Sequence, residues 1–237
     1  MNDALQRAND RTAVLVDTHD AGHTYGDGTR AVVAVHGVTC QVRRGDRIAV
    51  TGPSGSGKST LLYMLAGLEA ATTGSVEWPA FGATPAGRPT AAGLVFQGPS
   101  LIPTLDVTEN VGLPLVLAGM TDAAARQAAS RALGAVGIAS LAWKLPGELS
   151  GGQAQRVAIA RVLATEPALI LADEPTGQLD HTTGGQVIDA LLATAERIGA
   201  ALVVSTHDPA VARRLDTEWH LIDGGLAAPA TSTGAHR

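Results

Sequence analysis

Cysteine, aromatic residues and long apolar runs are scarce in this 237-residue chain, and each scarcity excludes a class of protein. Cys40 is its one cysteine, so no internal disulfide can form, and no cationic start leads into a short apolar block as in a secretion signal. Both features favour a cytosolic location. Aromatic residues make up 3% and the net charge is -5, which argues against a nucleic-acid partner. No apolar run approaches the roughly 20 residues that a membrane span needs.

Glycine, in contrast, is concentrated in residues 52–59, which read G-x-x-x-x-G-K-S. Residues 48–50 before this stretch favour a strand, and residues 61–65 after it favour a helix. A glycine-rich turn in that position lets backbone N–H groups converge on an anion at the helix N-terminus. Lys58 can reach the β- and γ-phosphates of a nucleoside triphosphate, and the Ser59 hydroxyl can bind Mg²⁺. The candidate nucleotide-binding residues are Gly52, Pro53, Ser54, Gly55, Ser56, Gly57, Lys58, Ser59 and Thr60.

Strand-like and helical patterns alternate along the chain, which predicts an α/β domain with a largely parallel core. Strands are expected at residues 13–16, 31–35, 38–42, 47–50, 74–78, 92–96, 168–172, 200–205 and 217–222. Helices are expected from the glycine-rich turn to about residue 67 and at 123–133, 153–165 and 185–197, and the pattern of residues 104–145 is mostly helical. The fully apolar run 168–172 is typical of a central parallel strand that is covered on both faces.

Two acidic residues, Asp173 and Glu174, directly follow that apolar run. Ligands of parallel α/β sheets bind beyond the carboxyl ends of the strands. Asp173 is therefore placed to hold the Mg²⁺ that Ser59 contacts, and Glu174 to act as general base toward an attacking water. The alternative is a strand end whose acids merely cap the next helix. The glycine-rich loop upstream favours the catalytic interpretation.

A second small-residue turn, Leu149-Ser150-Gly151-Gly152-Gln153, opens the helix expected at 153–165. This turn also could present N–H groups to an anion. Taken alone, the turn is better interpreted as a flexible Gly-Gly turn with Ser150 as the helix cap. Three further residues also have ordinary interpretations when taken singly. Gln97 would be a solvated polar residue, His207 a capping or packing histidine, and Tyr25 an aromatic residue packed in a turn.

The order of these motifs resembles the ATP-binding cassette (ABC) ATPase domain over about residues 14–225. Residues 52–59 match its Walker A motif, residues 169–173 its Walker B strand, and residues 149–153 its signature. Gln97 matches the Q-loop glutamine, Asp180 closes the D-loop stretch at 175–180, and His207 matches the switch histidine. Tyr25 stands where the family places an aromatic that stacks on adenine.

The resemblance implies the fold of a P-loop NTPase of the ABC type. That fold is α/β, with a mostly parallel core sheet, an N-terminal antiparallel β subdomain and an inserted helical subdomain, here at about residues 98–152. The ATPase domain is expected to span residues 12–226, between flexible tails at 1–11 and 227–237.

The resemblance also implies a mechanism in which two copies pair head to tail around two ATP molecules. Each ATP contacts Walker A of one copy and the signature residues of the other: Leu149, Ser150, Gly151, Gly152 and Gln153. His207 would contact the γ-phosphate and orient Glu174 with its water, Gln97 would sense Mg²⁺, and Asp180 would communicate across the dimer. No departure from the family pattern, such as Gln178 in place of the commoner Asn or Ala, removes a catalytic group, so an active ATPase is expected.

Residues 96–111 and 113–120 resemble the macrolide-exporter and lipoprotein-release group of cassettes. In that group the permease is a separate chain, which implies a membrane permease and a second copy of this chain as partners. The expected location is cytoplasmic, peripheral on the inner face of the cell membrane. The alternative is a cell-division-type cassette that gates cell-wall enzymes through a membrane protein and transports nothing.

Overall fold

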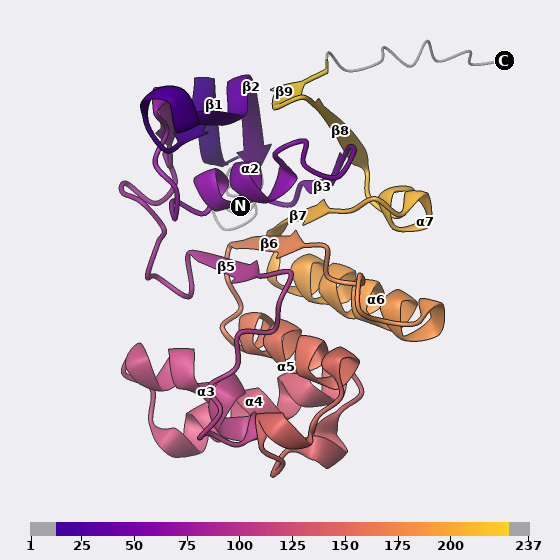
Figure 1. The fold of residues 1–237 in the computed structure, drawn as a ribbon. Coiled ribbons are helices and arrows are strands. Elements are labelled where there is room, and N and C mark those ends of the chain that lie inside the picture. The colour runs from indigo at the N-terminus through magenta and orange to yellow at the C-terminus, as the bar shows by residue number, and fades with distance from the viewer. Residues whose placement is uncertain (1–12, 228–237) are drawn as a thin grey trace, which may run out of the picture.

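The computed structural model of the protein describes residues 13–227, and Figure 1 shows two sheets together with a separate group of helices. The first sheet is antiparallel and has the order β2-β1-β4, with β1 at Val14–Tyr25, β2 at Val32–Arg43 and β4 at Thr73–Glu77. The second has the order β5-β6-β7-β3-β8-β9, and its first five strands run parallel. Their bounds are Ala92–Val95 (β5), Leu169–Asp173 (β6), Ala201–Ser205 (β7), Arg47–Thr51 (β3) and Thr217–Ile222 (β8), and β9 (Gly225–Leu226) lies antiparallel to β8.

The two central strands, β6 and β7, are buried along their whole length. Their side chains alternate between two hydrophobic clusters, because successive residues of a strand point to opposite faces. In β6, Leu169 and Leu171 belong to one cluster, whereas Ile170 and Ala172 belong to the other. Cover on both faces is the arrangement expected of a parallel sheet, and it confirms the prediction for residues 168–172.

Each cluster joins the central sheet to a different layer. Helix α2 (Lys58–Leu65) buries its apolar residues between the antiparallel sheet and one face of the central sheet. On the other face lie α5 (Gly151–Ala164) and α6 (His181–Ile198), and α3 (Val107–Leu117) and α4 (Asp122–Ala135) pack against α5 farther from the sheet (Figure 1). A short helix, α7 (Pro209–Ala212), follows β7. The glycine-rich loop therefore lies where the two sheets meet.

The N-terminal strands are longer than the sequence pattern predicts. The segments expected at 31–35 and 38–42 form one strand, β2, that continues through Gly37, whose φ is 62°. Strand β1 extends from Val14 to Tyr25, well beyond the expected residues 13–16. The pairing of β1 with β2 shifts register at several points, and such bulges let both strands continue through residues that look like turns.

The helical region at 104–145 contains α3, α4 and a short 3-10 turn at Ala139–Leu141, and a second such turn, Pro146–Glu148, follows it. Helix α5 runs on past residue 152 to the sheet, and the boundaries 98–152 of a helical subdomain stay a prediction. Apart from Ala227, which donates a backbone hydrogen bond to the carbonyl oxygen of His220, the tails expected at 1–11 and 227–237 lie outside the described residues. Between residues 13 and 227, no helix is both long and apolar enough to cross a membrane.

Candidate nucleotide-binding site

The glycine-rich loop joins β3 to α2 and requires glycine at two points. Gly52 has φ 146° and Gly57 has φ 97°, and Gly57 is the N-cap of α2. A Cβ atom at Gly52 would overlap the carbonyl oxygen of Leu221, and one at Gly57 would overlap that of Ala34. The loop is thus packed against β8 and β2 so closely that no larger side chain fits.

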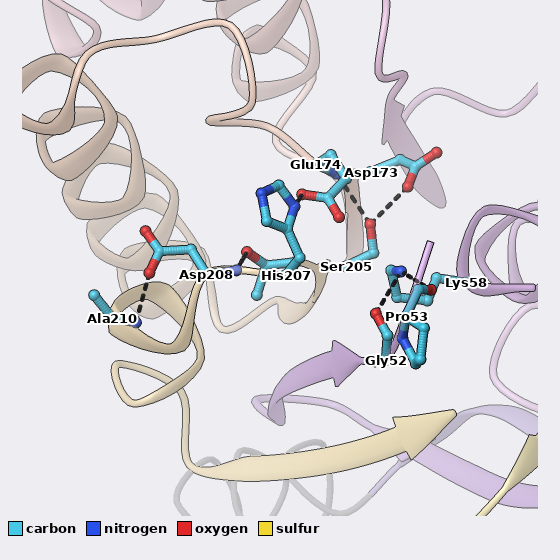
Figure 2. Close-up of polar contacts among 10 residues, drawn as sticks. Gly52, Pro53, Lys58, Asp173, Glu174, Ser205, His207, Asp208 and Ala210 are labelled. Atoms are coloured by element: carbon cyan, nitrogen blue, oxygen red, sulfur yellow. Dashed lines mark hydrogen bonds and ion pairs between the residues drawn. The ribbon is translucent and has the colours of Figure 1, made fainter. Parts of the chain in front are cut away.

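The ammonium group of Lys58 lies over this loop. Lys58 is only 8% exposed, and its Nζ donates to the carbonyl oxygens of Gly52 and Pro53, each at 2.9 Å (Figure 2). Both bonds are to neutral acceptors, and a phosphate oxygen makes a stronger, charge-assisted bond to an ammonium group. Lys58 is therefore held within the loop and can exchange these carbonyls for an anion.

A buried serine organises the two acids at the end of β6. Ser205 Oγ donates to Asp173 Oδ1 at 2.6 Å and accepts from the backbone N–H of Glu174 at 3.0 Å (Figure 2). The second carboxylate oxygen of Asp173 accepts from the Tyr63 hydroxyl at 3.4 Å. Burial and the Asp173 charge raise the pKa of Tyr63, so its hydroxyl stays protonated and donates. Sequence patterns indicated no role for Ser205 or Tyr63, and a serine at the end of an apolar strand is the only signal for the former.

His207 contacts Glu174 directly, as Figure 2 shows. The distance from His207 Nδ1 to Glu174 Oε2 is 2.9 Å, and the Glu174 backbone has φ 46°, in the left-handed region that few residues other than glycine adopt. An ionised carboxylate only accepts, so Nδ1 carries a proton and Nε2 remains for another partner. Asp208 fixes the segment after His207 by capping α7, where its Oδ1 accepts from Ala210 N at 2.7 Å.

These groups surround one cavity of about 650 Å³. Of the residues predicted from sequence, the cavity is lined by Ser54, Gly55, Gly57, Lys58, Ser59, Thr60, Gln97, Asp173, Glu174 and His207. The lining also includes Gly177 and Gln178 of the D-loop stretch, and three residues that the sequence did not indicate, namely Val32, Val33 and Ala34. Phosphate-binding groups, acids and a histidine from distant parts of the chain therefore open onto a single space.

Tyr25, the last residue of β1, lies beside this cavity without lining it. Its hydroxyl is 3.4 Å from Thr60 Oγ1, and its side chain is 40% exposed. Tyr25 pairs with Val32 across the antiparallel sheet, and Val32 lines the cavity. An aromatic ring is thus available at the mouth of the cavity.

The second glycine turn lies elsewhere. Residues 149–153 do not line the cavity, and Ser150 is the N-cap of α5. The Ser150 hydroxyl accepts from Gln153 N at 3.3 Å, and Gln153 Oε1 accepts from Ser150 N at 2.9 Å, which completes a capping box. Within the chain, Gly151 and Gly152 face Gln178 and Leu179 of the D-loop stretch.

Asp180 also lies outside the cavity and caps α6. Its carboxylate accepts from the N–H and the hydroxyl of Thr183, at 2.9 and 2.7 Å. These hydrogen bonds hold the pKa of the Asp180 carboxyl below its ordinary value. The charge of Asp180 is thus kept at the surface next to the signature turn.

Helix α5 connects the second glycine turn to Gln97. Gln155 Nε2 donates to the carbonyl oxygen of Phe96 at 3.2 Å, and Arg161 donates to those of Ser100 and Pro99 at 3.0 and 3.4 Å. Side chains of one helix thus hold the backbone on both sides of Gln97, which lines the cavity.

The strand–glycine loop–helix unit, with an acid at the carboxyl end of a nearby parallel strand, defines a P-loop NTPase. The sequence pattern of the family described as ABC transporter matches residues 35–177, and the chain belongs to that family. It is accordingly an ABC-type ATPase with ATP as its substrate, and the fold class inferred from the sequence is confirmed.

Relatives cover nearly the whole chain. The lipoprotein-releasing system ATP-binding protein LolD of Legionella pneumophila (strain Paris) is 42% identical over 222 residues, which are 91% of this chain and 98% of LolD. An uncharacterized ABC transporter ATP-binding protein of Mycobacterium tuberculosis is 41% identical over 226 residues, which are 92% of this chain and 90% of the relative. The dimeric structure of the bacterial ABC transporter cassette MJ0796 superposes with a TM-score of 0.86 at 35% identity, and covers 93% of this chain and 100% of the cassette. A post-hydrolysis MJ0796 dimer bound to ADP and Pi gives a TM-score of 0.85 with the same identity and coverage.

Proposed function

We propose that the chain is the ATP-hydrolysing subunit of a lipoprotein-releasing or export transporter. It pairs with a second copy when ATP binds and thereby drives a separate membrane permease. The carrying observation is that the catalytic groups line one cavity while the second glycine turn, residues 149–153, lies outside it. Relatives named as lipoprotein-releasing ATP-binding proteins support the choice of transporter.

Binding of ATP begins with its phosphates. The N–H groups of the glycine-rich loop and the N-terminus of α2 receive the β- and γ-phosphates, and Lys58 Nζ turns from the carbonyls of Gly52 and Pro53 to the phosphate oxygens. Tyr25 stacks on the adenine at the mouth of the cavity, beside Val32. The triphosphate is thereby held by charge and the base by apolar contact.

Hydrolysis uses Glu174 as the general base. Its side chain is 14% exposed, lines the cavity and accepts from His207 Nδ1, which fixes the direction in which it receives a proton from water. His207 Nε2 remains for the γ-phosphate, and Gln97 lies on the same cavity wall to position the water. Positioning and charge neutralisation account for most of the catalysis in such a phosphoryl transfer.

Mg²⁺ is the proposed cofactor, and the oxygens at the site fit it. The Ser59 hydroxyl, the Gln97 side-chain amide and the Asp173 carboxylate come from residues that line the cavity. Mg²⁺ prefers oxygen ligands and is held in ATPases by one or two carboxylates together with substrate phosphates. In the part of the chain that the structure describes, no three His, Cys, Asp or Glu side chains gather to hold a metal, which suits an ion whose coordination the substrate completes. Bound there, Mg²⁺ would offset the negative charge of the phosphates.

The second copy completes the site. Ser150, Gly151 and Gly152 open α5, and the N–H groups of its first turn that the capping box leaves unpaired can meet the γ-phosphate held by the other copy. Asp180 lies at the start of α6 beside this turn and communicates across the dimer. Hydrolysis releases the dimer, and this opening and closing moves the permease. The protein therefore acts on the cytoplasmic face of the membrane, without a nucleic-acid partner.

The cell-division alternative shares this ATPase cycle and differs in the membrane partner. It is not favoured, because similar relatives carry lipoprotein-releasing names.

The test is Glu174→Gln, which keeps the shape of the side chain and removes the base. Hydrolysis should fall by about 100-fold or more, since a general base contributes roughly 10²–10⁴ in rate. The variant should also form a stable dimer with ATP in size-exclusion chromatography. Glu77→Gln, an exposed position on β4, is the matched control and should behave as the wild type. If Glu174→Gln hydrolysed ATP at the wild-type rate, Glu174 would not be the general base. If the variant stayed monomeric with ATP, the proposal that two copies share each ATP site would be wrong.

A further inference from the structure

His23 is buried two residues before Tyr25, in the same strand. It is 8% exposed, whereas the side chain of His19, also in β1, is 59% exposed. The Nδ1 atom of His23 lies 2.7 Å from the carbonyl oxygen of Ala70, and Nε2 lies 3.6 Å from Glu69 Oε2. A carbonyl oxygen only accepts, so Nδ1 carries the proton. The short Nδ1 hydrogen bond to Ala70 and the burial of the side chain hold the His23 ring in one orientation.

The segment that contacts His23, which comprises Glu69 and Ala70, follows α2 and is hydrogen-bonded to it. After α2, the N–H groups of Leu68 and Glu69 both donate to the carbonyl oxygen of Tyr63, at 2.9 and 3.2 Å. Glu69 and Ala70 are therefore fixed to the helix that begins at the phosphate-binding loop. His23 ties β1 to the far end of that helix, while the Tyr25 hydroxyl meets Thr60 in its first turn.

The His23 ring in turn contacts the Tyr25 ring. The ring centroids are 4.4 Å apart and the planes are inclined by 69°, an edge-to-face arrangement. Residues two apart in a strand project from the same face, so the two rings meet although Thr24 lies between them. Tyr25 remains 40% exposed, and its strand partner Val32 lines the cavity.

We propose that His23 is a positioning residue for the nucleotide base. It holds the Tyr25 ring at the tilt at which the ring stacks on adenine, and so sets part of the affinity for ATP without touching ATP. The inference rests on the proposed role of Tyr25. It follows that His23 affects only the binding of the base, through Tyr25. The phosphate-binding loop, in contrast, recognises a triphosphate with or without a base.

The test compares two ligands, ATP and inorganic triphosphate, which lacks a base. Calorimetry of His23→Ala should show ATP binding weakened by about threefold to tenfold, the size expected for loss of an aromatic pair, and triphosphate binding unchanged. The KM for ATP should rise by the same factor with little change in kcat. His23→Phe keeps a ring next to Tyr25 and should recover part of the loss. His19→Ala is the matched control and should leave both affinities at the wild-type value.

A double-mutant cycle decides whether His23 acts through Tyr25. In a Tyr25→Ala background, His23→Ala should have no further effect on ATP affinity. The inference is overturned if His23→Ala and His23→Phe weaken ATP and triphosphate equally, because that marks a purely structural role. It is also overturned if His23→Ala acts equally with and without Tyr25. If Tyr25→Ala alone leaves the ratio of the ATP and triphosphate affinities unchanged, the proposed contact of Tyr25 with adenine is wrong, and so is the proposed role of His23. The Glu174→Gln test of the proposed function is independent of this result.

Discussion

The phosphate-binding loop and the Ser150 turn each open a helix, but the protein supports them differently. The loop before α2 has Gly52 against the Leu221 carbonyl and Gly57 against the Ala34 carbonyl, and α2 is buried between two sheets. Three strands and a helix therefore fix where its N–H groups point.

The turn before α5 is held mainly by its own capping box. Ser150 and Gly151 are both exposed, and neither lines the cavity. Both helix starts can favour an anion, yet of the two turns only the loop before α2 lines the cavity of about 650 Å³. The comparison supports a site that is half complete in one copy.

The two halves are nevertheless connected inside each chain. Arg161 and Gln155 of α5 hold the backbone on either side of Gln97, and Gln97 lines the cavity. Burial lowers the pKa of Arg161, but an arginine remains charged at neutral pH. A displacement of α5 by a second copy would therefore reach the nucleotide through this connection.

The largest effect on ATP hydrolysis should come from blocking the Ser150 turn, the exposed half of the proposed two-copy site. Ser150→Arg places a long side chain at the start of α5, where the γ-phosphate of the other copy would meet free N–H groups. We expect ATP hydrolysis to fall by about 100-fold, the scale for losing a donor that stabilises transition-state charge. ATP binding to the single chain should be unchanged, because residue 150 lies outside the cavity. Turnover assays, calorimetry and size-exclusion chromatography measure the three properties, and an unchanged ATP-dependent dimer would contradict the comparison.

A smaller effect is expected from a change in the phosphate-binding loop, the buried half of the proposed site. Lys58→Met keeps the buried stem and removes the ammonium group that bonds Gly52 and Pro53. A hydrogen bond to a charged group contributes roughly 1.5–3 kcal/mol, so ATP affinity should fall by about 10- to 100-fold. Here ATP binding itself is weakened, whereas Ser150→Arg leaves binding intact and removes dimerisation and hydrolysis. Lys144, which is partly exposed and lies outside the cavity, provides the matched control, and calorimetry of Lys144→Met should give wild-type affinity.

Much of this site could be predicted because its parts are local in sequence. The glycine spacing from Gly52 to Gly57 and the acids after an apolar strand are short patterns that can be recognised directly, and the resemblance supplied Gln97 and His207. The roles of these residues stay predictions; Gly57, both acids, Gln97 and His207 line one cavity, whereas Gly52, Pro53 and Ser56 do not line it.

The contacts that could not be predicted depend on register between distant strands. Ser205 meets Asp173 because β6 and β7 pair in parallel with these two residues side by side, and no local pattern fixes that register. Val32 and Val33 line the cavity because β2 continues as a bulged strand past His36 and Gly37, which resemble a turn. His23 likewise contacts Ala70 through a long-range hydrogen bond, and no local pattern predicts that this contact orients its ring toward Tyr25.

The smallest expected effect distinguishes two roles of Ser150, as the N-cap of α5 and as part of the proposed anion site. Helix α3 has the same kind of capping box, in which Asp106 Oδ1 accepts from Glu109 N at 2.7 Å and Glu109 Oε2 accepts from Asp106 N at 3.0 Å. Asp106→Ala and Ser150→Ala each remove one N-cap, so each should lower the free energy of unfolding by about 1 kcal/mol. Denaturant unfolding measures that loss, and the two variants should match.

Their ATPase rates should differ, because Asp106 caps α3 alone whereas Ser150 is proposed to contact the ATP held by the second copy. Asp106→Ala should hydrolyse ATP at the wild-type rate, and Ser150→Ala should be slower even at temperatures where both are fully folded. Equal loss of hydrolysis in the two variants would show that stability of the helical layer, and not an anion site at Ser150, is what the reaction needs.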